Sequence, residues 1–422
     1  MANKKKNEFN SNVMKLLTGA SIAQAIPIAT SPILTRLYSP EDFGVVAIFL
    51  AITGIFGTIA NGRYELAIVI PKDKRDSINL VALSISVSLS LSVLLLLLIL
   101  IFQNEILILL GNEEIKFWLY FIPVVIFFSG LFNALNYLNT KYKNFGLISK
   151  VKIIKSTSLV TVQIFFGFIK AGASGLIIGQ IVSHMFTNFT LAKNILTDKK
   201  LISNINFKKM KKLAWEYKKF PLLTVWGTLF SVLTRQTINI FISILYTASA
   251  VGYYSLVQRT IGLPSTIIGQ SVGQVFFQQA SQERNEIGNA KKVYISTLIK
   301  MLVISIPIFT FLYLFIEEII VFVFSEEWRV AGTYAKYLIP LFLLRFIASP
   351  LTLISIIFGK QIVDLLWQLS LLVFSILAFV LAYFYNLSIT NYLLLYSVFL
   401  GMHYLIIIII NYYIARNKTS DL

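Results

Sequence analysis

Long apolar stretches alternate with short polar or basic stretches through all 422 residues of the chain. Most apolar stretches run for about 20 residues or more, which is the length that an α-helix needs to cross the hydrocarbon core of a bilayer. We therefore predict twelve transmembrane helices and no β-sheet. The predicted spans cover residues 13–36, 43–62, 77–102, 115–139, 148–169, 175–196, 221–246, 250–278, 293–316, 332–357, 361–385 and 390–414.

A basic stretch near the midpoint divides these helices into two sets of six. Nine lysines fall between Lys193 and Lys219. We predict an N-terminal six-helix lobe over residues 1–196, a basic cytoplasmic connector over 197–220 and a C-terminal six-helix lobe over 221–422. Within the connector, Phe207, Met210, Ala214 and Tyr217 recur at helical spacing. This part of the chain is expected either to lie on anionic lipid headgroups as an amphipathic helix or only to keep the connector on the cytoplasmic side of the membrane.

The basic residues indicate how the predicted helices are oriented. Loops on the predicted cytoplasmic side hold 25 lysines and arginines, whereas the opposite loops hold four, namely Arg36, Lys116, Lys170 and Arg329. Because basic loops stay on the cytoplasmic side, this asymmetry predicts a multi-pass protein with both termini in the cytoplasm.

The two halves resemble each other at the turn that follows the first helix of each. Residues 37–44 read LYSPEDFG and residues 245–252 read LYTASAVG, an offset of 208 positions. The same element opening each half is what a parallel internal repeat predicts.

Composition excludes several classes of protein. The chain is 57% hydrophobic and 13% charged, which is typical of an integral membrane protein, and its net charge of +18 follows loop topology and gives no basic face for nucleic acid. It contains no cysteine, no nucleotide-binding or zinc-protease motif and no extramembrane stretch long enough for a catalytic domain. We therefore expect a transporter with no cofactor. His184 and His403 are expected to be hydrogen-bonding donors between helices or, alternatively, proton relays.

Arginines at membrane depth are the strongest candidates for a binding site. Arg235, Arg259 and Arg345 lie near the middle of three predicted helices. Each costs about 2.5–3.5 kcal/mol to insert on translocon scales, so we expect them to face a water-filled lumen and bind an anion. Arg36 and Arg63, at helix ends, are either interfacial anchors or further substrate contacts.

Polar residues follow two of the same predicted helices at helical spacing. Asn239 lies one turn beyond Arg235, and Gln270 lies three turns beyond Arg259. Such amides can bind sugar hydroxyl groups or can join helices to one another. Among the few acidic residues near the spans, Glu65 and Asp364 are either interfacial or sites of proton or sodium coupling.

Several stretches resemble one known family. They are LTRLYSPEDFG at residues 34–44, RYELAI at 63–68, GYYSL at 252–256 and QVFF at 274–277. In these stretches and in helix number, the sequence resembles bacterial polysaccharide flippases of the Wzx type, which belong to the multidrug/oligosaccharidyl-lipid/polysaccharide exporter superfamily.

The resemblance implies an all-α fold with two six-helix lobes around a central cavity. It implies alternating-access movement of undecaprenyl-diphosphate-linked oligosaccharide repeat units across the bacterial inner (cytoplasmic) membrane. The protein would serve the synthesis of O-antigen, lipopolysaccharide or capsule, together with glycosyltransferases and a polysaccharide polymerase. Arg36, Arg63, Arg235 and Arg259 would then contact the diphosphate or acidic sugars.

Two other functions stay open on the sequence. One is a cation-coupled multidrug exporter of the same superfamily, although the deep charges here are positive. The other is a membrane-embedded glycan polymerase, although such an enzyme is expected to carry a long external loop.

Overall fold

The computed structural model describes residues 2–196 and 199–417, and helices account for nearly all of them. The chain divides into two compact units, Met1–Val232 with Thr247–Ser249 and Leu233–Tyr246 with Ala250–Leu422. The predicted lobe boundaries at residues 196 and 221 stay a prediction. Helix α10 (Val225–Leu245) contributes residues to both units.

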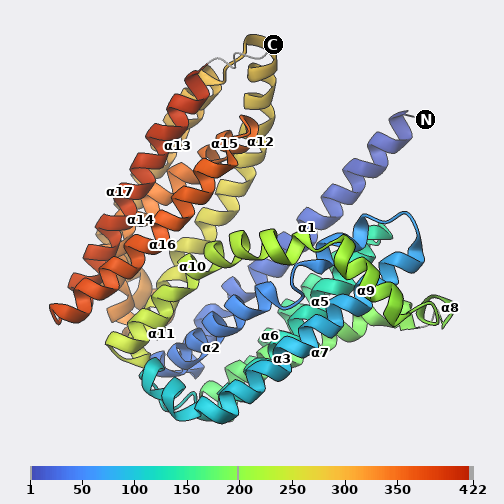
Figure 1. The fold of residues 1–422 in the computed structure, drawn as a ribbon. Coiled ribbons are helices and arrows are strands. Elements are labelled where there is room, and N and C mark those ends of the chain that lie inside the picture. The colour runs from blue at the N-terminus through green and yellow to red at the C-terminus, as the bar shows by residue number, and fades with distance from the viewer. Residues whose placement is uncertain (1, 197–198, 418–422) are drawn as a thin grey trace. The chain divides into compact units, whose positions relative to one another are not determined.

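The first unit is built from long helices joined by short turns (Figure 1). Its elements are α1 (Ala2–Leu37), α2 (Pro40–Ile59), η1 (Tyr64–Val69), α3 (Lys74–Leu110), α4 (Lys116–Leu119), α5 (Ile122–Lys141), α6 (Phe145–Phe168), α7 (Ala173–Leu196), α8 (Lys199–Ile202), α9 (Phe207–Glu216) and η2 (Phe220–Thr224). Within the unit, α6 packs on both α1 and α7, while α5 packs on α3 and α7.

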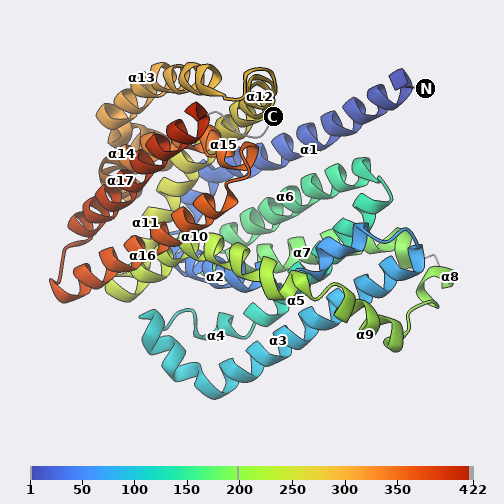
Figure 2. The ribbon, with the colours of Figure 1, turned by 45° about the horizontal axis from the view of Figure 1, so that its top comes forward.

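The second unit is likewise built from long helices joined by short connections. After α10 come α11 (Ala248–Val257), η3 (Gln258–Gly262), α12 (Leu263–Ile287), α13 (Lys291–Phe324), η4 (Glu326–Trp328), α14 (Arg329–Leu351), α15 (Leu353–Ile357), α16 (Gln361–Phe384) and α17 (Ile389–Arg416). Helix α14 packs on α12, α13 and α17, so it forms the centre of this unit (Figure 2).

The protein is an all-α integral membrane protein. Among the described residues, nine helices are long and apolar enough to span a membrane, and each coincides with a predicted span. The other three predictions fall on α1, on α7 and on the α11–η3–α12 region, which a π-helical segment interrupts. Helix α7 buries Ser183, Thr187 and Asn188. Its polar content explains why hydropathy alone does not mark it as a span.

Local sequence explains how the second helix begins. The Ser39 hydroxyl accepts a hydrogen bond from the Asp42 amide at 3.2 Å, and the Asp42 carboxylate accepts one from the Ser39 amide at 2.9 Å. This reciprocal capping box satisfies amides that the helix cannot pair, and Pro40 fits the first turn because it needs no donor there.

A tyrosine closes the first long helix of each half in a comparable way. The Tyr38 hydroxyl donates to the Gln163 carbonyl at 2.6 Å, within the first unit. The Tyr246 hydroxyl donates to the Leu387 carbonyl at 2.9 Å, within the second unit. The two tyrosines are the matched residues of the sequence repeat, so the repeat extends to a shared anchoring role.

Part of the connector forms the amphipathic helix α9. Leu213 is buried against the first unit, and the Tyr64 hydroxyl donates to the Ala214 carbonyl at 3.0 Å. Phe207 and Trp215 remain exposed on the same short helix. The helical spacing in this stretch is therefore confirmed, while a role on headgroups stays a prediction.

Candidate functional site

A buried polar cluster in the first unit surrounds the turn after α2. Gly62 and Arg63 both have positive φ, of 57° and 64°, so the chain turns sharply before η1. The Asn61 amide donates to the carbonyls of Ser84 at 3.1 Å and Gly130 at 3.0 Å, which joins the turn to α3 and α5. The turn is thus held rigidly by two neighbouring helices.

An ion pair lies at the centre of this cluster. The Arg63 Nη1 atom is 3.2 Å from Glu65 Oε1, and Glu65 is only 1% exposed. Burial raises the pKa of the Glu65 carboxyl, while its own backbone hydrogen bond and the charge of Arg63 act in the opposite direction. The structure therefore brings together a sequence-predicted binding residue and a predicted coupling residue.

Several buried atoms of the cluster keep unused hydrogen-bonding capacity. Asn61 Oδ1, Arg63 Nε and Glu65 Oε2 have no partner among the residues that the structure describes. Buried polar atoms normally find a partner, so such atoms mark a place where water or a polar ligand can bind. The Arg63 guanidinium in particular can still donate to an anion.

A second basic group in this unit was missed by the sequence analysis. Lys155 lies near the middle of α6, with its Nζ 5.4 Å from the centre of the Phe132 ring. Its charge acts on the buried His184 of α7. The sequence does indicate it, because a lysine well inside a predicted membrane-spanning helix, here 148–169, is a candidate functional residue.

The second unit brings two of the predicted arginines together. Arg235 of α10 and Arg345 of α14 lie close enough for their positive charges to act on each other. Tyr404 of α17 acts electrostatically on Arg235, and Arg345 acts on Tyr254 of α11. Two guanidinium groups within electrostatic range of each other and of two tyrosines form a basic site. Such a set suits phosphate oxygens, which accept bidentate hydrogen bonds from arginine.

Side chains next to this pair extend the polar surface. Asn239 lies one turn beyond Arg235 and is half-buried, with an Oδ1 atom that has no partner within the described part of the chain. The Thr234 hydroxyl donates to the Gln368 carbonyl at 3.4 Å, which connects α10 to α16. An amide acceptor near a guanidinium pair can bind a sugar hydroxyl group.

Other predicted site residues occupy different positions. Arg259 is half-buried in the π-helical segment η3. Gln270 lies in α12, and its side chain falls outside the described residues. Asp364, in the first turn of α16, accepts a hydrogen bond from the Gln368 side chain at 2.7 Å.

Arg36 is exposed at the end of α1. Its Nη1 atom donates to the Pro32 carbonyl at 2.9 Å, one turn back on the same helix. A basic side chain in the last turn of a helix interacts favourably with the negative end of the helix dipole. This contact favours the interfacial-anchor interpretation of Arg36 over the substrate-contact interpretation.

Comparisons with known proteins agree with one fold family. The structure is similar to an inward-facing multidrug resistance MATE family transporter of the MOP superfamily, with a TM-score of 0.71, 15% identity and coverage of 94% of this chain and 93% of that one. It is equally similar to the lipid II flippase MurJ in an inward closed conformation, with a TM-score of 0.71, 17% identity and coverage of 96% and 89%. The MATE multidrug transporter DinF-BH gives a TM-score of 0.63, 17% identity and coverage of 96% of both chains.

At the level of sequence, no curated protein matches the chain. The family described as "Polysaccharide biosynthesis protein" does match, over residues 33–332. The match covers most of the chain and includes Arg63, Arg235 and Arg259. The chain therefore belongs to the polysaccharide biosynthesis protein family, and its fold is that of the MOP-superfamily transporters and flippases.

Proposed function

We propose that this protein is a flippase that moves undecaprenyl-diphosphate-linked oligosaccharide repeat units across the bacterial inner membrane by alternating access. The observation that carries the proposal is the basic pair Arg235 and Arg345, whose charges lie within electrostatic range of each other, in a chain of a polysaccharide biosynthesis family. A diphosphate offers the negative charge and the paired oxygens that two guanidinium groups bind.

Membership of the fold supports a lipid-linked substrate. The MurJ neighbour is by its name a lipid II flippase, so this fold is used for such a substrate in at least one protein. The polyprenyl tail would stay in the bilayer during transport, since exposing its apolar surface to water costs about 25 cal/mol per Å². The protein therefore has to bind only the diphosphate and the sugars.

The cluster around Arg63 and Glu65 is proposed to link transport to a proton. A buried carboxyl with a raised pKa takes up a proton closer to neutral pH than an exposed one. Protonation would remove the negative partner of Arg63 and leave its guanidinium available for the substrate. Asp364 stays a second candidate for proton or sodium coupling.

Orientation and cellular setting belong to the same proposal. The excess of basic residues on alternate loops supports cytoplasmic termini. O-antigen, lipopolysaccharide or capsule synthesis beside glycosyltransferases and a polymerase is the pathway setting that such a substrate requires.

Leaflet labelling of lipid-linked sugar tests the proposal. Membranes with and without the protein would be treated with a membrane-impermeant probe that labels glycan on the outer leaflet only. The proposal predicts labelled glycan only where the protein is present. Equal labelling in both membranes would refute it.

A multidrug exporter is the second candidate, because MATE transporters share the fold. The basic pair disfavours organic cations as cargo. Altered drug susceptibility in a deletion strain, together with intact surface polysaccharide, would favour this candidate.

A further inference from the structure

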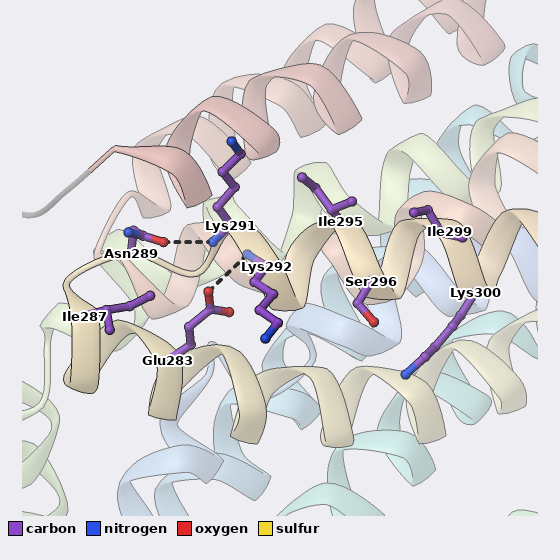
Figure 3. A pocket seen from close by; sticks show the side chains of 9 residues that line it. All are labelled: Glu283, Ile287, Asn289, Lys291, Lys292, Ile295, Ser296, Ile299 and Lys300. Carbon is purple, nitrogen blue, oxygen red and sulfur yellow. Dashed lines mark hydrogen bonds between the residues drawn. The ribbon is translucent and has the colours of Figure 1, made fainter.

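A cavity of about 700 Å³ lies in the second unit between the end of α12 and the beginning of α13 (Figure 3). It is separate from the arginine pair in sequence and in its lining. Glu283 and Ile287 line it from α12, and three lysines line it from α13 together with Ser296, namely Lys291, Lys292 and Lys300.

The lining residues of α13 form two rows along the helix. Lys292, Ser296 and Lys300 recur every fourth residue and therefore share one face, with about 6 Å of rise between successive members. Ile295 and Ile299 form the adjacent row, which is apolar after its first member, Lys291. Basic and apolar groups thus lie side by side, as an amphiphilic ligand requires.

Glu283 carries the one carboxylate of the lining, and this carboxylate accepts hydrogen bonds from backbone amides and forms no ion pair with the lining lysines that the structure describes. Its Oε1 accepts from the Lys292 amide at 3.0 Å (Figure 3). Its Oε2 accepts from the Val293 amide at 2.7 Å. It therefore caps the start of α13 through the backbone. Across the described residues, no ion pair is found for Lys292 or Lys300. Both ammonium groups are left for an external anion.

The position of Lys300 within a spanning helix makes this arrangement informative. Lys300 is nine residues beyond the first residue of α13, or about 13 Å along its axis, and the helix is one of the candidate membrane spans. Helix α13 has 34 residues and is about 51 Å long, which exceeds the hydrocarbon core of about 30 Å, so its first turns reach the interface. The stem of Lys300 can therefore extend toward that interface and bring its ammonium to a headgroup. Lys292, Ser296, Ile299 and Lys300 are all exposed, so a lipid can reach them.

We propose that this cavity binds an anionic glycerophospholipid. Its phosphate would lie between the ammonium groups of Lys292 and Lys300, near the Ser296 hydroxyl, and an acyl chain would cover Ile295 and Ile299. The site does not depend on the identity of the transported substrate. It would hold a resident membrane lipid against the outer surface of α13.

Native mass spectrometry of the purified full chain, titrated with phosphatidylglycerol, tests the site. Lys292→Gln combined with Lys300→Gln is expected to weaken phosphatidylglycerol binding by about 10-fold or more, because two charge-assisted contacts are lost. The control, Lys72→Gln with Lys360→Gln, removes the same charge at exposed positions outside the cavity and should bind like the unmodified protein. Lys292→Arg with Lys300→Arg should retain binding, which shows that the loss follows the charge and not misfolding.

Two further arms separate the possible sources of the phosphate. Phosphatidylcholine, with the same chains but no net charge, should bind weakly to every variant, and inorganic phosphate should not displace phosphatidylglycerol. Ile295→Ser with Ile299→Ser should weaken lipid binding as well. Equal phosphatidylglycerol binding by the double glutamine variant and its control would overturn the proposal. Displacement by inorganic phosphate, or a preference for a polyprenyl phosphate over phosphatidylglycerol, would also overturn it.

Discussion

Glu65 is the residue at which burial and charge oppose each other most clearly. Its carboxyl is 1% exposed and lies 3.2 Å from Arg63, so it is both desolvated and ion-paired. Desolvation is the larger effect and raises the pKa of the carboxyl. A raised pKa means that the folded protein binds this proton more tightly than the unfolded chain. The contribution of Glu65 to stability therefore falls as pH rises from the unfolded pKa through the folded pKa.

Glu65→Gln is expected to mimic the protonated state at every pH. In the unmodified protein, affinity for a sugar diphosphate diester should increase as pH falls through the pKa of Glu65, because Arg63 loses its carboxylate partner. The diester keeps its own charge over this range. The variant should show the higher affinity throughout, as measured by isothermal titration calorimetry.

Glu105→Gln provides the matched control, since Glu105 is an exposed carboxyl on α3. It should keep the pH dependence of the unmodified protein. A Glu65→Gln protein that still gains affinity at low pH would rule out Glu65 as the titrating group.

Arg345 is expected to bind the diphosphate together with Arg235. Losing one hydrogen bond to a charged group costs about 1.5–3 kcal/mol, so Arg345→Gln should weaken binding of a lipid diphosphate by roughly 10- to 150-fold. Arg345→Lys should recover part of the loss, because lysine keeps the charge without the bidentate geometry.

The same calorimetric titration serves for these arginine variants. Arg416→Gln, which removes an exposed arginine at the end of α17, is the control and should bind normally. Unchanged affinity in Arg345→Gln would show that the arginine pair does not contact the diphosphate.

At the scale of elements, the capping box at the start of α2 gives a direct test of local structure. Ser39→Ala removes the side-chain acceptor for the Asp42 amide and should lower the free energy of unfolding by about 0.5–2 kcal/mol. Thermal unfolding in detergent measures the change. Ser90→Ala, at an exposed serine whose hydroxyl bonds only within α3, should leave stability nearly unchanged. A larger effect at Ser90 than at Ser39 would contradict the capping role.

Asn79 determines how the connector is held on α3. Its side chain donates to the Asn204 carbonyl at 3.0 Å and accepts from the Asn206 amide at 2.8 Å. Asn79→Ala removes both hydrogen bonds, and each contributes about 0.5–1.5 kcal/mol to holding the segment.

Limited trypsin digestion reports this change, because lysines lie on both sides of the bonded segment. Cleavage in the connector should become faster in Asn79→Ala than in the unmodified protein, and Ser90→Ala should behave like the latter. Equal cleavage rates in all three proteins would show that Asn79 does not hold the connector.

Spanning helices could be predicted because lipid imposes a simple rule on them, a run of about 20 apolar residues. That rule located nine candidate spans and the amphipathic spacing located α9. It could not reveal the π-helical break at Gln258–Gly262, since backbone hydrogen-bond register leaves no hydropathy signal. It also gave no sign that Arg63 and Glu65 would be buried together, because their burial depends on α3 and α5 closing over the turn.

For the whole molecule, the comparisons establish the fold and the family, whereas the class of cargo has to be inferred from the charges of the residues inside the helical units. MATE transporters and MurJ share the fold with this chain at 17% identity or less, so fold alone does not separate drug export from lipid flipping. Basic residues in both units favour an anionic cargo: the half-buried Arg63 and Lys155 in the first, and the half-buried Arg345 with the exposed Arg235 in the second.

Transbilayer movement in reconstituted vesicles tests the account most directly. The purified chain would be incorporated into vesicles that contain undecaprenyl-diphosphate-linked oligosaccharide, and an impermeant reagent would measure the fraction of glycan that reaches the outer leaflet over time. For a flippase that binds the diphosphate through its arginine pair, movement should depend on the protein, be strongly reduced in Arg235→Gln with Arg345→Gln and be retained in Arg416→Gln. Movement at the same rate in empty vesicles and in all three proteins would contradict it.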